Sequence, residues 1–128
     1  MQTEMKSVIQ PVESVSSWKE ARLLITDYFE SPPVVLKIED SIIGTLGNFS
    51  ASTGKAKSKK TFNLCAIVSS ALTNSTVLNY TSFLPIGKHK ILYVDTEQSK
   101  FHCKRVLSRI LQLAGLPLNQ HPKNIEFL

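Results

Sequence analysis

The sequence contains few cysteines and histidines, and this shortage excludes several kinds of site. Only two of its 128 residues are cysteine and three are histidine. Cys65 and Cys103 lie in apolar, helix-like stretches and lack the spacing of a metal knuckle or redox pair, and the histidines are scattered. We therefore expect two buried free thiols and no metal site built from protein ligands alone.

Long apolar runs are missing as well. A membrane span requires about 18 consecutive apolar residues, and no stretch of this sequence approaches that length. The N-terminal stretch MQTEMKSVIQPVESVSS also lacks the apolar segment of a signal peptide. These two absences predict a cytoplasmic protein without a membrane partner.

Acidic residues are scarce after residue 40. Residues 1–40 carry four basic and seven acidic side chains, whereas residues 41–128 carry eleven basic and only three acidic ones. Four lysines fall within six residues, and they account for most of the net charge of +5. These lysines are Lys55, Lys57, Lys59 and Lys60. A lysine-dense loop of this kind is most often a solvated turn or a contact for a polyanion.

The beginning of the chain differs from the rest in composition. Residues 1–16 are polar and without a sustained period, which predicts a flexible tail. From residue 17 apolar residues recur at helical spacing, and Ser17 with Glu20 has the form of a capping box. This pattern predicts a helix that ends at Pro32.

The remaining pattern alternates between strands and helices. Two β-rich runs, a buried helix, a strand, a second helix and a short final strand are expected, at residues 34–38, 42–51, 60–75, 91–95, 99–114 and 124–128. A loop is expected from about residue 74 to about residue 89. This order predicts an α/β fold in which helices cover a mostly parallel sheet, with residues 17–41 as its lead-in and residues 42–128 as a βαβα segment.

The lysine loop matches a phosphate-binding pattern. The residues GKAKSKKT, from Gly54 to Thr61, agree with GxxxxGK[ST] at three of its four fixed positions. Gly54 permits a sharp exit from the strand, Lys60 would reach the β- and γ-phosphates, and the Thr61 hydroxyl would bind Mg²⁺. Lys59 stands where the second glycine is expected, and a positive φ there would cost a lysine about 1 to 3 kcal/mol. The pattern predicts an ATP–Mg²⁺ site formed by Gly54, Lys55, Ser58, Lys59, Lys60 and Thr61.

Two of the three late acidic residues follow the strand ILYVD. In a parallel sheet the carboxyl ends of strands share one edge, so Asp95 and Glu97 are expected near the lysine loop. Glu97 is the candidate general base that activates water, and Asp95 is the candidate outer partner of Mg²⁺. Capping of the next helix by Asp95 or Ser99 is the structural alternative.

Two segments resemble a known family. GTLGNFSASTGKAKSKKTF and ILYVDTEQSKFHCKRVLSRI are similar to the RecA-like, AAA-type P-loop ATPases encoded on mobilisable transposons and related elements or plasmids of gut anaerobes. Members of that family carry a TGKAKS(R/K)KT loop and a YVDTEQS-type strand, so lysine at position 59 belongs to the family pattern. The resemblance covers about residues 17–128.

The resemblance implies a fold and a function. It implies a three-layer RecA-like core, incomplete at its C-terminus, in which Glu97 is the catalytic glutamate and Lys60 and Thr61 bind phosphate and Mg²⁺. Relatives act in mobilisation, excision or plasmid replication, in some cases as helicase-like hexamers on DNA. Because later core strands, including the Walker B strand, are not present, we expect an N-terminal portion or a truncated ATPase that binds nucleotide weakly and turns over little by itself.

Two other functions remain open. The four lysines of the loop, helped by Lys104, Arg105 and Arg109, would suit a nucleic-acid-binding module. Alternatively, the chain is a regulatory or assembly partner that docks on full-length ATPase subunits through an unfinished sheet edge.

Overall fold

The structure is a computed structural model that describes residues 14–56 and 58–128. It divides into two compact units, Met1–Ser31 and Pro32–Leu128, which we describe separately. Residues 1–13, which form most of the predicted tail, lie outside the described residues. None of the helices in the described ranges has the length and apolar character needed to cross a lipid bilayer.

Within residues 14–31, the described part of the first unit, the chain forms one short helix, α1 (Ser14–Glu20). The predicted helix from Ser17 to Pro32 is therefore wrong, and Ser17 lies inside α1 instead of at its N-cap. The Asp27 carboxylate accepts a hydrogen bond of 2.8 Å from the backbone N–H of Leu24, which turns the chain. The apolar residues of this segment are exposed, so tertiary packing does not support the helical period, and short helices without such packing are marginal.

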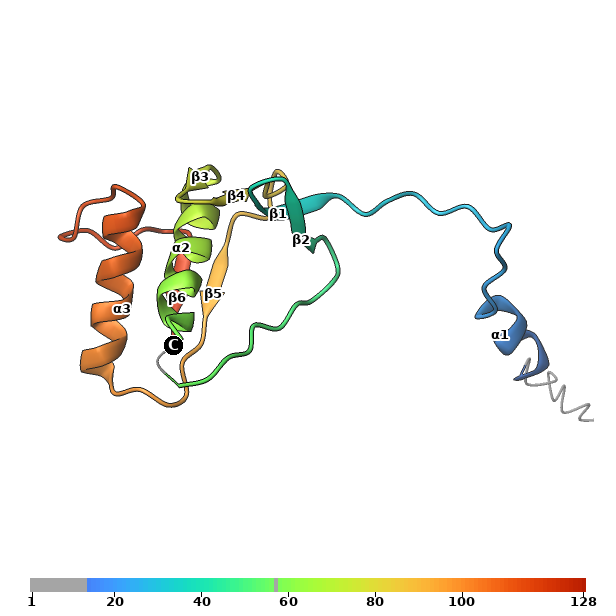
Figure 1. Ribbon diagram of the computed structural model, residues 1–128, viewed down its shortest axis with the longest axis horizontal. Coiled ribbons are helices and arrows are strands. Elements are labelled where there is room, and N and C mark those ends of the chain that lie inside the picture. Colours follow the sequence, from blue (N-terminus) through green and yellow to red (C-terminus); the bar gives the residue numbers. More distant parts are fainter. Residues whose placement is uncertain (1–13, 57) are drawn as a thin grey trace, which may run out of the picture. The chain divides into compact units, whose positions relative to one another are not determined.

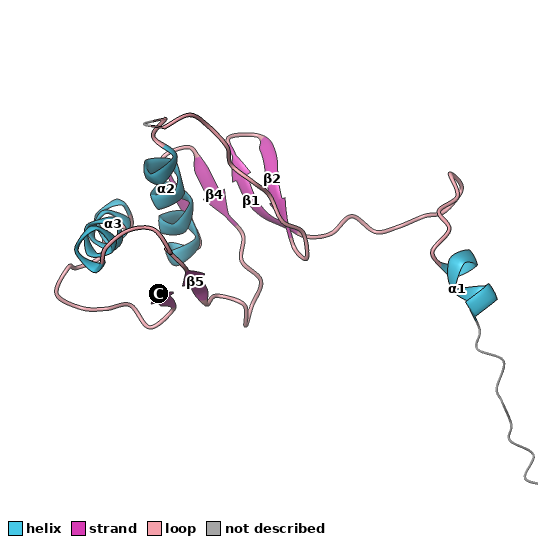
Figure 2. Cartoon of the chain, turned by 90° about the horizontal axis from the view of Figure 1, so that it is seen from below, coloured by secondary structure: helices cyan, strands magenta, loops and turns pink. Residues whose placement is uncertain are grey.

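The second unit contains strands and two longer helices. In chain order they are β1 (Val34–Ile38), β2 (Ser41–Thr45), α2 (Lys60–Thr73), β3 (Thr76–Val77), β4 (Tyr80–Ser82), β5 (Ile91–Tyr93), α3 (Lys100–Leu113) and β6 (Ile125–Phe127). Figures 1 and 2 both show α2 between α3 and the strands β1, β2 and β4. The prediction of a helix buried on more than one face is thus confirmed for α2.

The strands form two separate sheets. Four of them form an antiparallel sheet in the order β2-β1-β4-β3, and the other two, β5 and β6, form a small parallel sheet. The predicted fold class, a RecA-like core with a mostly parallel sheet, is therefore wrong. Only the β5-α3-β6 portion has the parallel arrangement that the alternating pattern predicted.

The hairpin β3–β4 explains the difference. After α2 the chain turns back at once, because Leu78 adopts a left-handed φ of 53° and Val77 pairs with Tyr80. Strand β4 then pairs with β1 along the edge opposite β2. As a result β5 does not join the sheet that contains β2, and the long loop expected at about residues 74–89 contains two strands.

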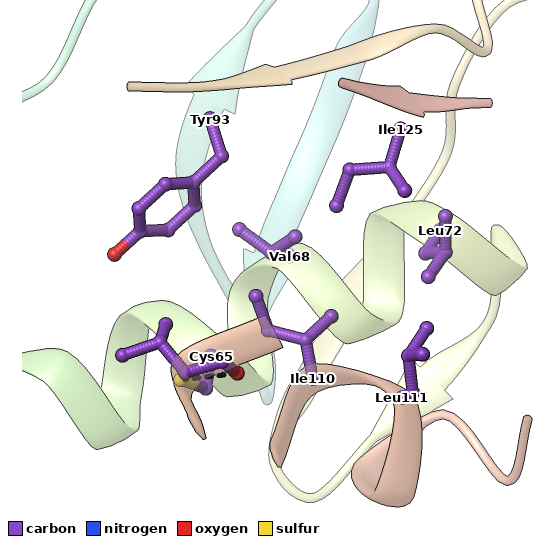
Figure 3. Packing of buried hydrophobic residues seen from close by; sticks show 8 residues of the cluster. Cys65, Val68, Leu72, Tyr93, Ile110, Leu111 and Ile125 are labelled. Carbon is purple, nitrogen blue, oxygen red and sulfur yellow. Dashed lines mark hydrogen bonds between the residues drawn. The ribbon is translucent and has the colours of Figure 1, made fainter. Parts of the chain in front are cut away.

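The main core lies between α2, α3 and the parallel pair. Figure 3 shows Tyr93 of β5 and Ile125 of β6 pointing toward Val68 and Leu72 of α2 and toward Ile110 of α3. The Ser69 hydroxyl joins the two helices by donating a hydrogen bond of 2.8 Å to the carbonyl oxygen of Ile110. This packing fixes which side of α3 faces inward and which faces solvent.

Both cysteines are free thiols. Cys65 is fully buried in the core, as predicted, whereas Cys103 is only half-buried. The difference arises because Cys65 lies on α2, the central helix, while Cys103 lies in the first turn of α3, where the helix emerges from the β5–α3 connection.

Candidate phosphate-binding loop

The loop that matches the phosphate-binding pattern connects β2 to the N-terminus of α2. Lys59 is the N-cap of α2 and has a φ of 59° and a ψ of 21°, which is the left-handed conformation. This is the conformation that a glycine at the second fixed position of the pattern would adopt without cost. Lys59 therefore has the conformation that glycine favours, and it bears the strain expected of a lysine with a positive φ.

Gly54, at the first fixed position, lies against the end of the loop. A Cβ atom at residue 54 would be 2.7 Å from the Ser58 hydroxyl oxygen, closer than real side chains approach. The backbone N–H of Ser58 donates a hydrogen bond of 3.2 Å to the carbonyl oxygen of Lys55, which closes the intervening turn. A larger residue at position 54 would therefore displace the Ser58 hydroxyl from its present position.

The Lys60 side chain reaches back across the loop to Gly54. Its ammonium donates a hydrogen bond of 2.6 Å to the carbonyl oxygen of Gly54. The Lys60 side chain is exposed, so the other donors of the ammonium remain accessible to a ligand.

The N-terminus of α2 adds further donors. The bond from the Asn63 N–H to the Lys59 carbonyl, 3.1 Å long, belongs to the first turn of the helix, so the backbone N–H groups of residues 60–62 precede the intrahelical ladder. No acidic residue occupies this turn and no side chain caps it. Free N–H groups, the helix dipole and a lysine together favour an anion.

A surface pocket of about 330 Å³ opens at this helix end. Its lining comprises Ser58, Lys59, Lys60, Thr61, Phe62 and Arg109. Arg109 comes from α3 and adds a second kind of cation to the lysines of the loop. Sequence reasoning assigned Arg109 to the nucleic-acid alternative, because only the packing of α3 against α2 brings this side chain to the loop.

Arg109 also influences Cys65 in the first half of α2. Burial raises the pKa of the Cys65 thiol, and the guanidinium of Arg109 opposes that rise. This electrostatic coupling is consistent with the position of Arg109 beside the N-terminal half of α2.

A larger pocket of about 700 Å³ shares Lys60 and Thr61 with the smaller one. Its other walls are Leu36, Ile38, Ile43, Ser50, Ala51, Ser52, Asn63, Leu64, Ile67 and Tyr80. It is predominantly aliphatic with one aromatic ring, which is typical of pockets that hold the organic part of a ligand. Both pockets border the start of α2, where they share Lys60 and Thr61.

The two candidate carboxylates lie in the connection between β5 and α3. Asp95 is half-buried, and its carboxylate accepts hydrogen bonds from the backbone N–H groups of Glu97 (3.0 Å) and Gln98 (2.9 Å). Glu97 itself is exposed. Asp95 therefore shapes the turn before α3, which is close to the structural alternative that the sequence offered.

Ser99 has the backbone position of the N-cap of α3, but its hydroxyl lies 2.9 Å from the His102 ring nitrogen and caps no backbone group.

The carboxylates are not joined to the loop by the hydrogen bonds found among residues 14–56 and 58–128. The expectation that they share one sheet edge with the loop rested on a continuous parallel sheet, and β2 and β5 belong to different sheets. The roles assigned to Asp95 and Glu97 stay predictions.

The oxygen atoms near the loop suit a magnesium ion better than a transition metal. The described part of the chain contains no group of three or more His, Cys, Asp or Glu side chains that could hold a metal by themselves. Magnesium usually takes one or two protein oxygens together with phosphate oxygens and water, and the Thr61 hydroxyl at the pocket is such a donor. The residues present therefore fit Mg²⁺ only as the companion of a bound phosphate.

Comparison with known protein families, with curated proteins and with solved structures finds no match for this chain. The resemblance to mobile-element ATPases therefore depends on the two sequence motifs alone.

Proposed function

We propose that the chain binds the phosphate groups of ATP–Mg²⁺ with the loop Gly54–Thr61. The observation that carries the proposal is the left-handed backbone of Lys59 directly before α2, since it reproduces the glycine conformation of the phosphate-binding pattern. The close approach of Ser58 to Gly54 and the hydrogen bond from Lys60 support the same reading.

Each residue of the site has a proposed task. The backbone N–H groups at the start of α2 and the Lys60 ammonium would bind phosphate oxygens, and Arg109 would supply further positive charge. Thr61 would hold Mg²⁺, which when bound neutralises part of the phosphate charge. The aliphatic pocket that contains Tyr80 would take the nucleoside.

By its two motifs, the chain would act as the nucleotide-binding part of an ATPase that moves or replicates mobile DNA. The exposed position of Glu97, without a hydrogen bond to the loop in the described structure, supports the expectation of slow hydrolysis by the chain alone.

Isothermal titration with ATP–Mg²⁺ tests this proposal. The wild-type chain should bind, and a nucleotide concentration of about 100 times Kd should stabilise it by about 2.7 kcal/mol. The Lys60→Ala variant loses a charge-assisted contact of about 1.5 to 3 kcal/mol, so its Kd should rise by about tenfold to 150-fold.

Lys88→Ala is the matched control, because Lys88 is exposed and belongs to neither pocket at the loop. It should bind ATP–Mg²⁺ as the wild type does. Absence of nucleotide binding in the wild type, or an equal effect of both substitutions, would contradict the proposal. A DNA affinity that falls equally with alanine at Lys55, Lys59 or Lys60, without nucleotide binding, would instead favour the nucleic-acid function of the loop.

A further inference from the structure

The solvent side of α3 carries positive charge without any acidic residue. The helix KFHCKRVLSRILQL contains Lys100, Lys104, Arg105 and Arg109 and no Asp or Glu. Packing of the buried residues Val106, Ile110 and Leu111 against the core leaves Lys104 and Arg105 exposed. The packing of the core therefore fixes the orientation of Lys104 and Arg105, whereas Arg109 lies at the loop before α2.

The arrangement of these cations is unfavourable for the helix itself. Lys100 and Lys104 are four residues apart, as are Arg105 and Arg109, and like charges at this spacing destabilise a helix. An ordinary solvated helix would interleave acidic residues to relieve this repulsion. Lys104 and Arg105 are exposed on a helix that contains no acidic residue, and they are suited to a polyanion, which would supply the missing negative charge.

An exposed aromatic ring lies on the same side of the helix. Phe101 is 69% exposed and precedes Arg105 by one helical turn. Its ring meets the His102 ring edge-on, with centroids 5.5 Å apart, and the Ser99 hydroxyl lies 2.9 Å from the same imidazole. The Phe101 side chain is thus largely exposed beside the cations.

We propose that this face of α3 binds single-stranded nucleic acid. Lys104 and Arg105 would contact successive phosphates, and Phe101 would stack on an unpaired base. Alternating cations and aromatic rings are the means by which proteins hold single strands without reading their sequence. A duplex keeps its bases stacked inside, and an acidic protein or an anionic membrane offers no base plane for Phe101, so the ring favours a single strand.

Fluorescence polarisation with a labelled oligothymidylate tests the proposal on the full chain. The Phe101→Ala variant should bind about 5-fold to 140-fold more weakly, which corresponds to the loss of one stacked base. The Lys104→Ala/Arg105→Ala variant should bind more weakly at low salt, and its plot of log K against log salt should be less steep by about 0.7 for each cation removed. Phe101→Trp keeps a stacking surface and should keep the affinity.

Two controls separate this surface from other effects. Lys19→Ala/Arg22→Ala removes the same charges from exposed positions of the first unit and should leave oligothymidylate binding within about twofold of the wild type. Lys60→Ala should lose ATP affinity and keep oligothymidylate affinity, so failure of the nucleotide proposal and failure of this one are distinguishable.

Three results would overturn the proposal. The first is an oligothymidylate affinity that neither α3 variant changes. The second is a duplex bound as tightly as the single strand and indifferent to Phe101→Ala. The third is competition by polyglutamate or by phosphatidylserine vesicles as effective as that by unlabelled oligothymidylate.

Discussion

The ammonium of Lys60 donates a hydrogen bond of 2.6 Å to the carbonyl oxygen of Gly54, six residues earlier in the chain. This bond joins the two ends of the loop, and the Ser58 hydroxyl lies beside Gly54. Because ordering a loop opposes binding, a loop that is already closed loses less entropy when phosphate arrives. Substitutions at Gly54 and Ser58 test this arrangement of the loop.

Gly54→Ala should weaken ATP–Mg²⁺ binding with little change in stability. The added Cβ would be 2.7 Å from the Ser58 hydroxyl oxygen, so either that hydroxyl or the loop must shift. Since the loop is exposed, we expect the free energy of unfolding to change by less than about 0.5 kcal/mol. We expect the Kd for ATP–Mg²⁺ to rise about tenfold, equivalent to about 1.4 kcal/mol.

The double variant Gly54→Ala/Ser58→Ala provides the control. Removal of the hydroxyl leaves the Ser58 Cβ at 3.4 Å as the nearest atom of that residue, which is a tolerable contact. The double variant should bind ATP–Mg²⁺ more tightly than the sum of the two single effects predicts. Titration of the four proteins should give a coupling energy of about 0.5 to 1 kcal/mol. Purely additive effects would mean that the two side chains do not compete for this space.

At position 59 a glycine variant should have a higher free energy of unfolding than an alanine variant. Within a helix the order is normally the reverse, because alanine has the higher helix propensity. Lys59 has a φ of 59°, where glycine carries no steric penalty and alanine costs about 1 to 2 kcal/mol. At the exposed helical residue Asn63 alanine should be more stable than glycine by about 1 kcal/mol. Urea unfolding of the four variants measures both differences, and the same order at both positions would contradict the left-handed conformation.

Local elements of this fold follow from the sequence more closely than their pairing does. The apolar period of α2 and of α3 predicts both helices within one or two residues, and the final strand is also where the pattern places it. Strand pairing depends on where the chain reverses direction. The reversal at Leu78 requires a positive φ, and a leucine in the sequence does not indicate such a turn as a glycine would. The alternation of strands and helices was therefore compatible with a parallel sheet that the structure does not form.

For the candidate site, too, the local part is predictable from the sequence and the part that depends on tertiary packing is not. The loop residues are contiguous, so the pattern finds them all, and the left-handed position at Lys59 follows from alignment with a glycine. Arg109 lies 48 positions after Thr61 in the sequence and reaches the loop only because α3 packs on α2. The expected convergence of Asp95 with the loop depended on sheet topology, which is the least predictable level of the fold.

Tyr80 should contribute to the binding of ATP and not to that of tripolyphosphate. It lies in β4 and lines the aliphatic pocket that meets the loop at Lys60 and Thr61. Truncation to alanine removes apolar surface worth about 1.5 to 3 kcal/mol when covered, so the Kd for ATP–Mg²⁺ should rise about tenfold or more.

Tyr80→Phe keeps the ring and should bind ATP–Mg²⁺ almost as the wild type does. Titration with ATP–Mg²⁺ and with tripolyphosphate–Mg²⁺ separates the two pockets. Equal losses for both ligands in Tyr80→Ala would show that the substitution disturbs the loop, and that the aliphatic pocket does not hold the nucleoside.

The core between α2 and β5 should make the protein sensitive to alkali. Burial raises the pKa of the Cys65 thiol, and burial, with the nearby charges of Cys65, Asp95 and Cys103, raises the pKa of the Tyr93 phenol. A raised pKa means that the folded state favours the protonated form. The stability from both groups is therefore complete below their unfolded values of about 8.5 and about 10, and it is lost as pH rises through the folded values.

Urea unfolding at a series of pH values from about 7.5 to about 10 measures this loss, whose window begins at the unfolded pKa of cysteine. The wild-type free energy of unfolding should fall across the upper part of that range. Cys65→Ala should start lower, because it leaves a small cavity, but its decline should be shallower since the buried thiol is absent. Cys103→Ala keeps the buried thiol and should retain the part of the decline that comes from Cys65. If Cys65→Ala declined as steeply as the wild type, the predicted contribution of the Cys65 thiol would be refuted.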